Sequence, residues 1–391
     1  MENPILAMIP SGYNAADAKL YSILPSDGSG DFTVSVDADA TRISKEGLIE
    51  GVALNQARLT YDPLNPECPS LLLEPTRTNN IRYSEDTTAA DWTDPLNEWS
   101  SVSNTETSPS GELTADTIDL TASDNASLIR VTNMSLAAGV YAVSFWIKDL
   151  EGGLTSGTID LGDEGTGDTT PSISTVSNQW VRVERIITIT STKTFVDIQL
   201  NFNGASNKVS IWGLQVELGS FKSSYVPTVS TIVTRTNDVC KDAGNAALFN
   251  VSKLSLFIDV NNFKTNTGSF SYIVLTDGQN SPINMIRLDY TQNSILIRSY
   301  DNGTIKLSYN ITSVVPNQRN KVLLTFDNNE AKTYFNGVLK NTSTSITIPS
   351  GLDSLSFTNR TESGGYFQGE VHDARVYDRV LTETEAIKLT T

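Results

Sequence analysis

The chain has 391 residues, a length typical of two or three domains of about 150 residues each, and its 38% hydrophobic residues suffice for packed cores. Its 28 basic and 45 acidic residues give a formal net charge of −17, which argues against binding to nucleic acid or to an anionic membrane surface. No stretch approaches 18 consecutive apolar residues, so we expect no membrane insertion. The two cysteines, Cys68 and Cys240, are too few for a disulfide framework, and we expect reduced thiols.

Residues 1–95 are predicted to be an irregular N-terminal region. They hold eight of the 14 prolines, and proline cannot donate a hydrogen bond to a sheet. Within them, only residues 32–36 and 70–74 have the pattern of strands. Because such a segment lacks a core of its own, we expect it to bury its backbone against a partner.

Residues 96–235 are predicted to form an antiparallel β-sandwich. In residues 195–202 the apolar side chains of Val196, Ile198, Leu200 and Phe202 alternate with polar ones, which is typical of a half-buried strand. The segments 141–147, 181–189 and 209–218 behave likewise. Trp146, Trp180 and Trp212 fall on or beside these strands and are expected in the core.

Residues 236–391 are predicted to form a second sandwich. The apolar residues at 254, 256, 258 and 260 share one face of a strand, and Asn336-Gly337 lies between two strand halves as a hairpin turn. One convincing helix is expected, at the end of the chain, where Thr382 and Glu385 fit a capping box. The fold class is therefore all-β: an irregular N-terminal arm followed by two antiparallel, jelly-roll-like β-sandwich domains.

Candidate catalytic residues are scarce, and we predict a protein that is not an enzyme. His372 is the only histidine, and its strand pattern places it on a surface face together with Glu370. A Glu-x-Asp-x-Glu motif, expected in a laminarinase-like sandwich enzyme, is absent.

Two further carboxylate pairs have the spacing of neighbours on one strand face. These are Asp37 with Asp39, and Glu383 with Glu385 at the start of the predicted helix. Acidic residues favour the first turn of a helix, and we interpret both pairs as structural.

No cofactor is predicted, and calcium remains the open alternative. Oxygen-rich loops occur at residues 160–168, 259–262 and 277–280, but none matches the spacing of a known calcium loop. The two cysteines lack the spacing of a zinc site.

Trp92 and Trp99 are the candidate glycan-binding residues. Both lie in a polar, acidic segment, where an exposed ring could stack on a sugar. The alternative is that these two side chains pack onto the first sandwich.

The C-terminal unit resembles a laminin-G-like or concanavalin-A-like jelly roll. The resemblance is carried by Lys321-Val-Leu-Leu-Thr-Phe-Asp327, by Lys332-Thr-Tyr-Phe-Asn-Gly-Val-Leu339, and by residues 366–385, which contain Gly369-Glu-Val-His-Asp-Ala-Arg-Val-Tyr377. It covers about 140 residues and implies a fold rather than a ligand, because this fold hosts lectins, adhesins, enzymes and spacers.

A second resemblance is to bacteriophage virion proteins of the fibre or head-decoration kind. It is carried by residues 9–13, 20–32, 40–50 and 68–79, and by residues 212–228, a stretch that begins Trp212-Gly-Leu-Gln-Val-Glu-Leu218 and in such proteins closes a galactose-binding-like sandwich. The resemblance implies a head or tail fibre that is assembled in the host cytoplasm and released by lysis, in keeping with an N-terminus that does not read as a signal peptide.

Several expectations follow from this second resemblance. The fibre would be a homotrimer that contacts other virion proteins and binds host or environmental glycans weakly. Its docking contacts would lie in the N-terminal region, at Ile9, Tyr13, Leu20 and Tyr21. The alternatives are a polysaccharide depolymerase acting as a glycoside hydrolase, and an inert spacer.

Overall fold

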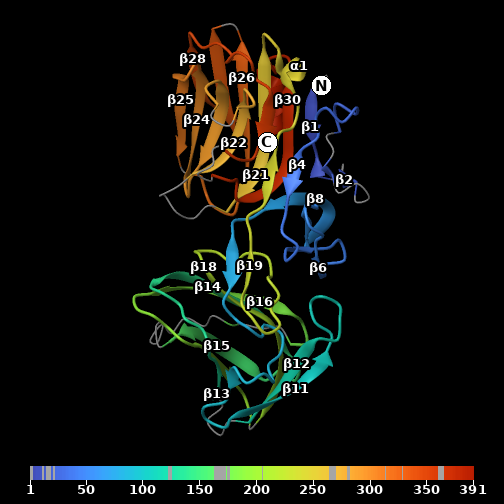
Figure 1. Cartoon of the computed structure of the whole chain (residues 1–391), viewed down its shortest axis with the longest axis vertical. Helices are drawn as coiled ribbons and strands as arrows, with labels where there is room; N and C mark the ends of the chain where they lie inside the picture. Colours follow the sequence, from blue (N-terminus) through green and yellow to red (C-terminus); the bar gives the residue numbers. More distant parts are fainter. Residues whose placement is uncertain are drawn as a thin grey trace.

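The computed structural model shows two β units arranged along the long axis of the molecule, joined by a narrow waist (Figure 1). It describes residues 3–10, 13–14, 19–20, 23–121, 126–162, 173, 177–204, 206–263, 270–279, 282–312, 314–327, 329–359 and 365–391. The predicted fold class is confirmed: the chain is nearly all β, and its strands form antiparallel sheets.

The C-terminal unit is a sandwich whose larger sheet has eight strands. Seven of them follow in the order β28, β27, β26, β21, β30, β8, β7, and β1 also pairs with β30. The strands are β1 (Leu6–Met8), β7 (Leu59–Asp62), β8 (Asn65–Leu73), β21 (Leu254–Asn262), β26 (Arg319–Asp327), β27 (Glu330–Phe335), β28 (Val338–Thr344) and β30 (Gly369–Tyr377).

The smaller sheet of this unit has five strands in the order β25, β24, β23, β22, β29. They are β22 (Ser271–Thr276), β23 (Met285–Tyr290), β24 (Ser294–Asp301), β25 (Thr304–Thr312) and β29 (Ser354–Ser356). Leu256 and Ile258 of the larger sheet pack in one core with Ile295 and Ile297 of the smaller sheet. The alternation predicted along β21 therefore builds the centre of the sandwich, as expected.

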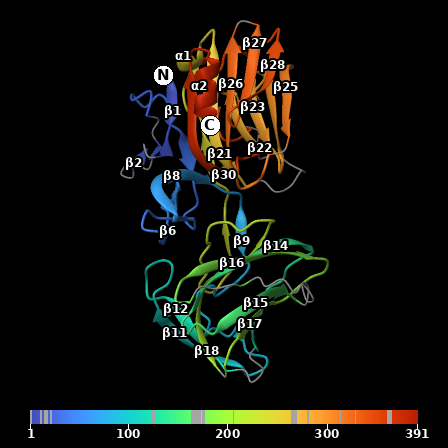
Figure 2. The same ribbon diagram turned by 180° about the vertical axis from the view of Figure 1, so that it is seen from behind.

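The predicted hairpin and terminal helix are both present. Asn336 and Gly337 have φ values of 46° and 78°, the left-handed region that an Asn-Gly turn supplies. Helix α2 (Glu383–Thr390) starts with the capping box of Thr382 and Glu385 and packs on the outer face of the larger sheet (Figure 2). A short helix that the sequence did not predict, α1 (Ala246–Phe249), is capped by Asn245.

The middle unit is a second sandwich with a separate core. One sheet has the order β10, β13, β17, β15, and the other β11, β12, β18, β14, β16. The strands are β10 (Trp92–Thr93), β11 (Trp99–Glu106), β12 (Ala115–Leu120), β13 (Ala126–Val131), β14 (Gly139–Asp149), β15 (Leu154–Leu161), β16 (Val181–Ile189), β17 (Val196–Phe202) and β18 (Asn207–Leu218). Ile198 and Leu200 are buried between the sheets, as their alternation predicts.

The N-terminal region does not form a separate arm. Its strands β1 and β8 pair directly with β30, so residues near both ends of the sequence share one sheet. Leu71 and Leu73 of β8 are buried in the C-terminal core. The partner against which this segment buries its backbone is therefore a later part of the same chain, which a pattern of prolines cannot reveal.

Four small two-stranded sheets complete the fold. They pair β2 (Tyr13–Asn14) with β3 (Lys19–Leu20), β4 (Thr33–Ser35) with β20 (Val239–Lys241), β5 (Thr41–Ile43) with β6 (Ile49–Gly51), and β9 (Arg77–Asn79) with β19 (Val233–Arg235). The pair β9–β19 forms the waist between the units (Figures 1 and 2). No helix among the described residues is long and apolar enough to cross a membrane. Cys68 is exposed, Cys240 is buried, and both are free thiols.

Candidate functional site

A cavity of about 660 Å³ lies where the three parts of the chain meet, and we call it the junction cleft. One wall is the β5–β6 hairpin, a second comes from β14 and β16 of the middle unit, and a third comes from β8 and β30 of the C-terminal sheet. Cavities of this size, at a domain boundary and mostly apolar with a few polar groups, are where ligands usually bind.

Two tryptophans form the aromatic wall of the junction cleft. The ring of Trp146 packs edge-on against Trp212 and Tyr225, with ring centroids 5.4 and 5.7 Å apart. The Nε1 atom of Trp180 donates a hydrogen bond of 2.9 Å to the carbonyl oxygen of Thr107. Trp212 is buried, whereas Trp146 and Trp180 are half-buried and line the cavity.

Arg182 holds the ring of Trp146 in place. Its guanidinium lies 4.4 Å from the ring centroid and donates to the hydroxyl of Ser144 at 3.0 Å and to the carbonyl of Ser223 at 2.9 Å. The strand pairing shifts register beside Trp146, and Gly213, next to its register partner Trp212, has a φ of 69°. A Cβ atom at Gly213 would lie 2.9 Å from the ring, so only glycine fits this approach.

The hairpin wall is tied to the middle unit by two hydrogen bonds. The amide of Ile49 donates to the carbonyl of Pro109 at 3.0 Å, and the hydroxyl of Thr41 donates to the carbonyl of Tyr225 at 2.6 Å. Arg42 on the same hairpin pairs with Glu50 at 2.7 Å. The hairpin therefore has a fixed position over the cavity.

Two carboxylates whose pKa values are shifted in opposite directions line the C-terminal wall. Burial and the nearby charge of Glu74 raise the pKa of Glu370, which accepts a hydrogen bond of 3.3 Å from the side chain of Asn261. Burial alone would also raise the pKa of Glu74, but Arg235 and Arg58 overcome it and lower this pKa to about 2. Glu74 is therefore ionised at neutral pH, while Glu370 keeps a proton to a higher pH than an ordinary glutamate.

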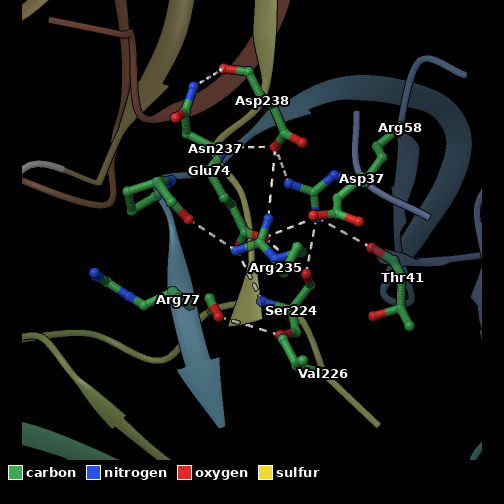
Figure 3. Close-up of polar contacts among 12 residues, drawn as sticks. Asp37, Thr41, Arg58, Glu74, Arg77, Ser224, Val226, Arg235, Asn237 and Asp238 are labelled. Atoms are coloured by element: carbon green, nitrogen blue, oxygen red, sulfur yellow. Dashed lines mark hydrogen bonds and ion pairs between the residues drawn. The ribbon is translucent and has the colours of Figure 1, made fainter. Parts of the chain in front are cut away.

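Glu74 belongs to a buried ion-pair cluster that adjoins the cleft (Figure 3). The cluster consists of Arg58 and Glu74 from the N-terminal region and of Arg235 and Asp238 from the segment entering the C-terminal unit; the exposed fraction of each side chain is 3% or less. Arg58 donates to Glu74 at 2.7 Å and pairs with Asp238, and Arg235 lies 3.2 Å from Glu74. Two positive and two negative charges balance, as burial of ions requires.

The ion-pair cluster also reaches the end of the middle unit. The backbone amide and the hydroxyl of Ser224 donate to the Glu74 carboxylate at 2.8 and 2.7 Å. Arg58 donates further to Ser224 and to the carbonyl of Thr41. The cluster therefore joins the hairpin, both units and the waist at one point, and fixes the walls of the cleft relative to one another.

The predicted glycan-binding residues Trp92 and Trp99 lie against the core of the middle unit, Trp92 buried and Trp99 half-buried. Trp92 is only 5% exposed, and its Nε1 atom donates to the carbonyl of Tyr83. Trp99 packs against the same core and donates to the carbonyl of Leu128. The alternative interpretation, packing onto the first sandwich, describes both side chains.

The four candidate docking residues lie beside the C-terminal unit or outside the described residues. Ile9 is half-buried and follows β1. Tyr13 and Leu20 pair with each other across β2 and β3, and no side-chain environment is described for them. Tyr21 lies outside the described residues.

His372 has the predicted position, with Val371 buried on one face of β30 and the imidazole on the other at 23% exposure. Its Nε2 atom is 3.9 Å from Glu370, and burial lowers its pKa. The two carboxylate pairs have structural roles: Asp37 accepts hydrogen bonds from Thr236, and Glu385 caps α2.

The candidate calcium loops show no cation site in the described part of the chain. The carboxylate of Asp277 accepts hydrogen bonds from the backbone amides of Ile283 and Asn284, and Asp259 forms a two-point ion pair with Arg319. Residues 163–168 of the first loop lie outside the described residues. Among those that are described, no group of three or more His, Cys, Asp or Glu side chains is placed to hold a metal.

The local sequence around each residue does not predict the site that the fold assembles. Trp146 and Trp180 were expected in the core, but they border the cleft because the β5–β6 hairpin, about 100 residues earlier in the chain, packs opposite them. A tryptophan beside a strand has the same local sequence pattern whether its ring is buried in the core or borders a cleft. Arg182, which lies two residues after Trp180, was the one signal that this face is not purely apolar.

Comparison with known families identifies the C-terminal fold. Residues 250–386 match the profile of the concanavalin A-like lectin/glucanases superfamily. This unit is therefore a concanavalin A-like, laminin-G-like sandwich, as its sequence resemblance predicted. No curated protein matches the chain.

Solved structures with a similar sandwich share little sequence with this chain. The carbohydrate-binding module (CBM40) of the Ruminococcus gnavus IT-sialidase, bound to α2,3 sialyllactose, is 17% identical, with 39% of this chain and 94% of that chain covered and a TM-score of 0.32. Domain 4 of the arabinanase AbnA from Geobacillus stearothermophilus, in complex with arabinotriose, is 18% identical over 40% and 73% of the chains, with the same TM-score of 0.32. The SAP-like pentraxin of Limulus polyphemus is 16% identical over 36% and 70%, with a TM-score of 0.29.

Proposed function

We propose that this chain is a non-catalytic saccharide-binding protein and that the junction cleft is its principal binding site. The observation that carries the proposal is the pair of half-buried tryptophans, Trp146 and Trp180, beside polar groups from three segments of the chain. The C–H face of a sugar ring is apolar and packs on aromatic rings, whereas its hydroxyls need hydrogen-bonding partners.

Polar groups suited to sugar hydroxyls line the same cavity. Arg42 and Lys222 supply donors at the rim, where each also pairs with a glutamate. Glu370 can accept, or donate when protonated, because its pKa is raised. Since the hairpin and the ion-pair cluster fix these groups before a ligand arrives, binding needs little reorganisation.

Binding to the full chain tests this proposal directly. We expect Trp180→Ala to weaken binding of a neutral oligosaccharide identified on a glycan array by about tenfold or more, measured by isothermal titration calorimetry. The matched control is Trp99→Phe, which changes a tryptophan of the middle unit that lies away from the cleft. Equal affinities of the two variants would contradict the assignment of the cleft.

A glycoside hydrolase is the second candidate, and one observation favours it. Glu370 and Glu74 line one cavity with pKa values shifted in opposite directions, as in an acid and a base that act on one glycosidic bond. Against it, both oxygens of Glu74 already accept hydrogen bonds from Ser224, and its side chain is only 3% exposed. A carboxylate so occupied is a poor nucleophile or base.

Release of reducing ends separates the two candidates. Binding without release of reducing sugar over prolonged incubation supports the non-catalytic function. Release that Glu370→Gln abolishes, while binding persists, would establish the hydrolase instead.

We further propose that the protein is displayed on a bacteriophage particle as a head or tail fibre and acts as a homotrimer. The support is the resemblance of residues 9–13, 20–32, 40–50, 68–79 and 212–228 to virion proteins. Trimerisation would multiply weak saccharide contacts by raising the effective concentration. Light scattering of the purified chain tests the trimer, and antibody labelling of particles in the electron microscope tests the location; a monomer and unlabelled particles would refute this proposal.

A further inference from the structure

A second cluster of charged and aromatic side chains lies far from the cleft, on the outer face of the five-stranded sheet. Ile286, Leu288 and Tyr290 of β23 and Ile295 and Ile297 of β24 point into the core. Because side chains alternate along a strand, the intervening residues face outward. We call the outward-facing set of Tyr272, Arg287, Asp289, Arg298 and Tyr300 the arginine face.

Asp289 is the buried centre of the arginine face. Its side chain has no exposed surface, and its Oδ1 atom lies 2.6 Å from Nε of Arg287. Nη2 of Arg287 donates to the other oxygen, Oδ2, at 3.1 Å, and Nη2 of Arg298 lies 3.7 Å from the same oxygen. The side chains of Arg287 and Arg298 remain 18% and 22% exposed. The two guanidinium groups are therefore accessible at the surface, whereas the Asp289 carboxylate beneath them is not.

Two tyrosines order the guanidinium groups. The Arg287 guanidinium carbon lies 5.1 Å from the ring centroid of Tyr272 and 5.5 Å from that of Tyr300, a cation–π arrangement on both. Nη1 of Arg298 donates a 3.0 Å hydrogen bond to the hydroxyl of Tyr300. The arginines are therefore held in position, and little side-chain entropy is lost when they bind a ligand.

The charge of this face is not balanced within the cluster, which distinguishes it from other ion pairs of the chain. Arg319 with Asp259 and Arg130 with Asp197 form two-point pairs, as Arg287 does with Asp289. On the arginine face, two arginines share one carboxylate, which leaves one positive charge in a protein whose formal net charge is −17.

We propose that the arginine face is a second binding site, independent of the junction cleft, for the carboxylate of an acidic saccharide. Guanidinium groups present planar arrays of donors that match the two oxygens of a carboxylate. The sugar ring that carries the carboxylate would pack against the half-exposed rings of Tyr272 and Tyr300. The chain would then contact a polysaccharide at two places, one near the waist and one on the distal unit.

The test uses the full chain and a defined probe, tri-galacturonate, with its carboxyl-reduced counterpart as the neutral comparison. Arg298→Gln removes the charge but keeps a group able to donate to Tyr300. The matched control is Lys306→Gln, which removes the same charge from an exposed position on the neighbouring strand β25. We expect Arg298→Gln to weaken binding of tri-galacturonate by about tenfold or more and Lys306→Gln to change it less than twofold.

Other outcomes of this experiment would show that the arginine face does not bind an acidic saccharide. Binding of the carboxyl-reduced sugar as tightly as the acid, equal losses in both variants, or no binding of tri-galacturonate at all would each overturn the proposal. Preference for a short peptide with a free over an amidated C-terminus, in the absence of saccharide binding, would reassign the face to protein carboxylates and overturn it likewise. Trp180→Ala should leave tri-galacturonate binding intact, so failure of the cleft and failure of this face are distinguishable.

Discussion

At the scale of single residues, Glu74 connects the stability of the molecule to its binding site. It lies in the wall of the junction cleft and in the ion-pair cluster, and its carboxylate contacts residues from both sides of the waist. Its pKa is lowered to about 2 from an ordinary value of 4.5, so the folded state favours the ionised form. The contribution of Glu74 to stability is therefore present above about pH 4.5 and is lost as pH falls towards 2.

The first prediction concerns removal of this charge. Glu74→Gln keeps the size of the side chain but leaves Arg58 and Arg235 buried with one carboxylate between them. We expect the free energy of unfolding at pH 7 to fall by about 3–5 kcal/mol, the usual cost of breaking a buried ion pair, as measured by urea denaturation. The control is Glu50→Gln, because the pair of Glu50 with Arg42 is partly exposed and its loss should cost less than about 1 kcal/mol.

The second prediction is a pH dependence. Between pH 4.5 and 2 the wild type should lose stability relative to Glu74→Gln, so that the difference between them shrinks by about 3 kcal/mol. Burial raises the pKa of Asp238, and the charge of Glu74 adds to this rise, so the titration of Asp238 differs between the two proteins and partly offsets the expected change. A difference that stays constant over this pH range would show that Glu74 is not the titrating group.

At the scale of single elements, the local sequence predicted strands and turns whose whole pattern lies within one short segment. The alternation of residues 195–202 predicted β17, and Asn336-Gly337 predicted the β27–β28 hairpin. Trp146 and Trp180 were assigned to the core because a strand pattern records which side chains alternate and not what lies opposite them. The β5–β6 hairpin, which packs opposite these two rings and closes the cleft, is remote in sequence. The residues around Trp146 and Trp180 therefore do not predict it.

The third prediction tests the cap of α2. Thr382→Ala removes the side chain that accepts from the amide of Glu385, and we expect a loss of about 1 kcal/mol in the free energy of unfolding. Thr382→Ser, which retains a hydroxyl, should lose much less. Since α2 packs on the sheet through Ala386 and Leu389, the loss should appear in the unfolding of the C-terminal unit.

The fourth prediction concerns the bulge beside Trp146. Gly213→Ala places a methyl group 2.9 Å from the Trp146 ring at a φ of 69°, so the ring must move. We expect weaker saccharide binding and a changed near-ultraviolet circular dichroism signal from the tryptophans. Gly51→Ala is the control, because nothing lies within 4 Å of its added methyl group. Unchanged spectra and affinity for Gly213→Ala would show that this packing does not shape the cleft.

At the scale of the whole molecule, three strands of the N-terminal region, β1, β7 and β8, belong to the C-terminal sandwich. The sequence resemblance indicated the family of residues 250–386, but it could not show that β1, β7 and β8 complete the larger sheet. Pairing between strands about 300 residues apart leaves no local trace in composition or periodicity. The middle unit is therefore inserted between two parts of one sandwich.

The fifth prediction follows from that topology. A fragment of residues 236–391 keeps β21 but lacks β1 and β8, which also pair with β30, and it exposes part of the core that Leu71 and Leu73 cover. We expect it to aggregate or to bind a hydrophobic dye strongly, whereas the full chain does neither. A soluble, monomeric fragment with the melting temperature of this unit in the full chain would contradict the prediction.

The pairing of β1 and β8 with β30 has a further consequence for biosynthesis. The ribosome makes β1, β7 and β8 about 300 residues before β30 (Gly369–Tyr377). The middle unit, whose strands are contiguous in sequence, can close while translation continues, but the edges of β1 and β8 that pair with β30 stay unpaired until β30 has been made. A nascent chain that stalls before β30 would therefore carry one finished sandwich and one open sheet, the form most exposed to chaperones and proteases.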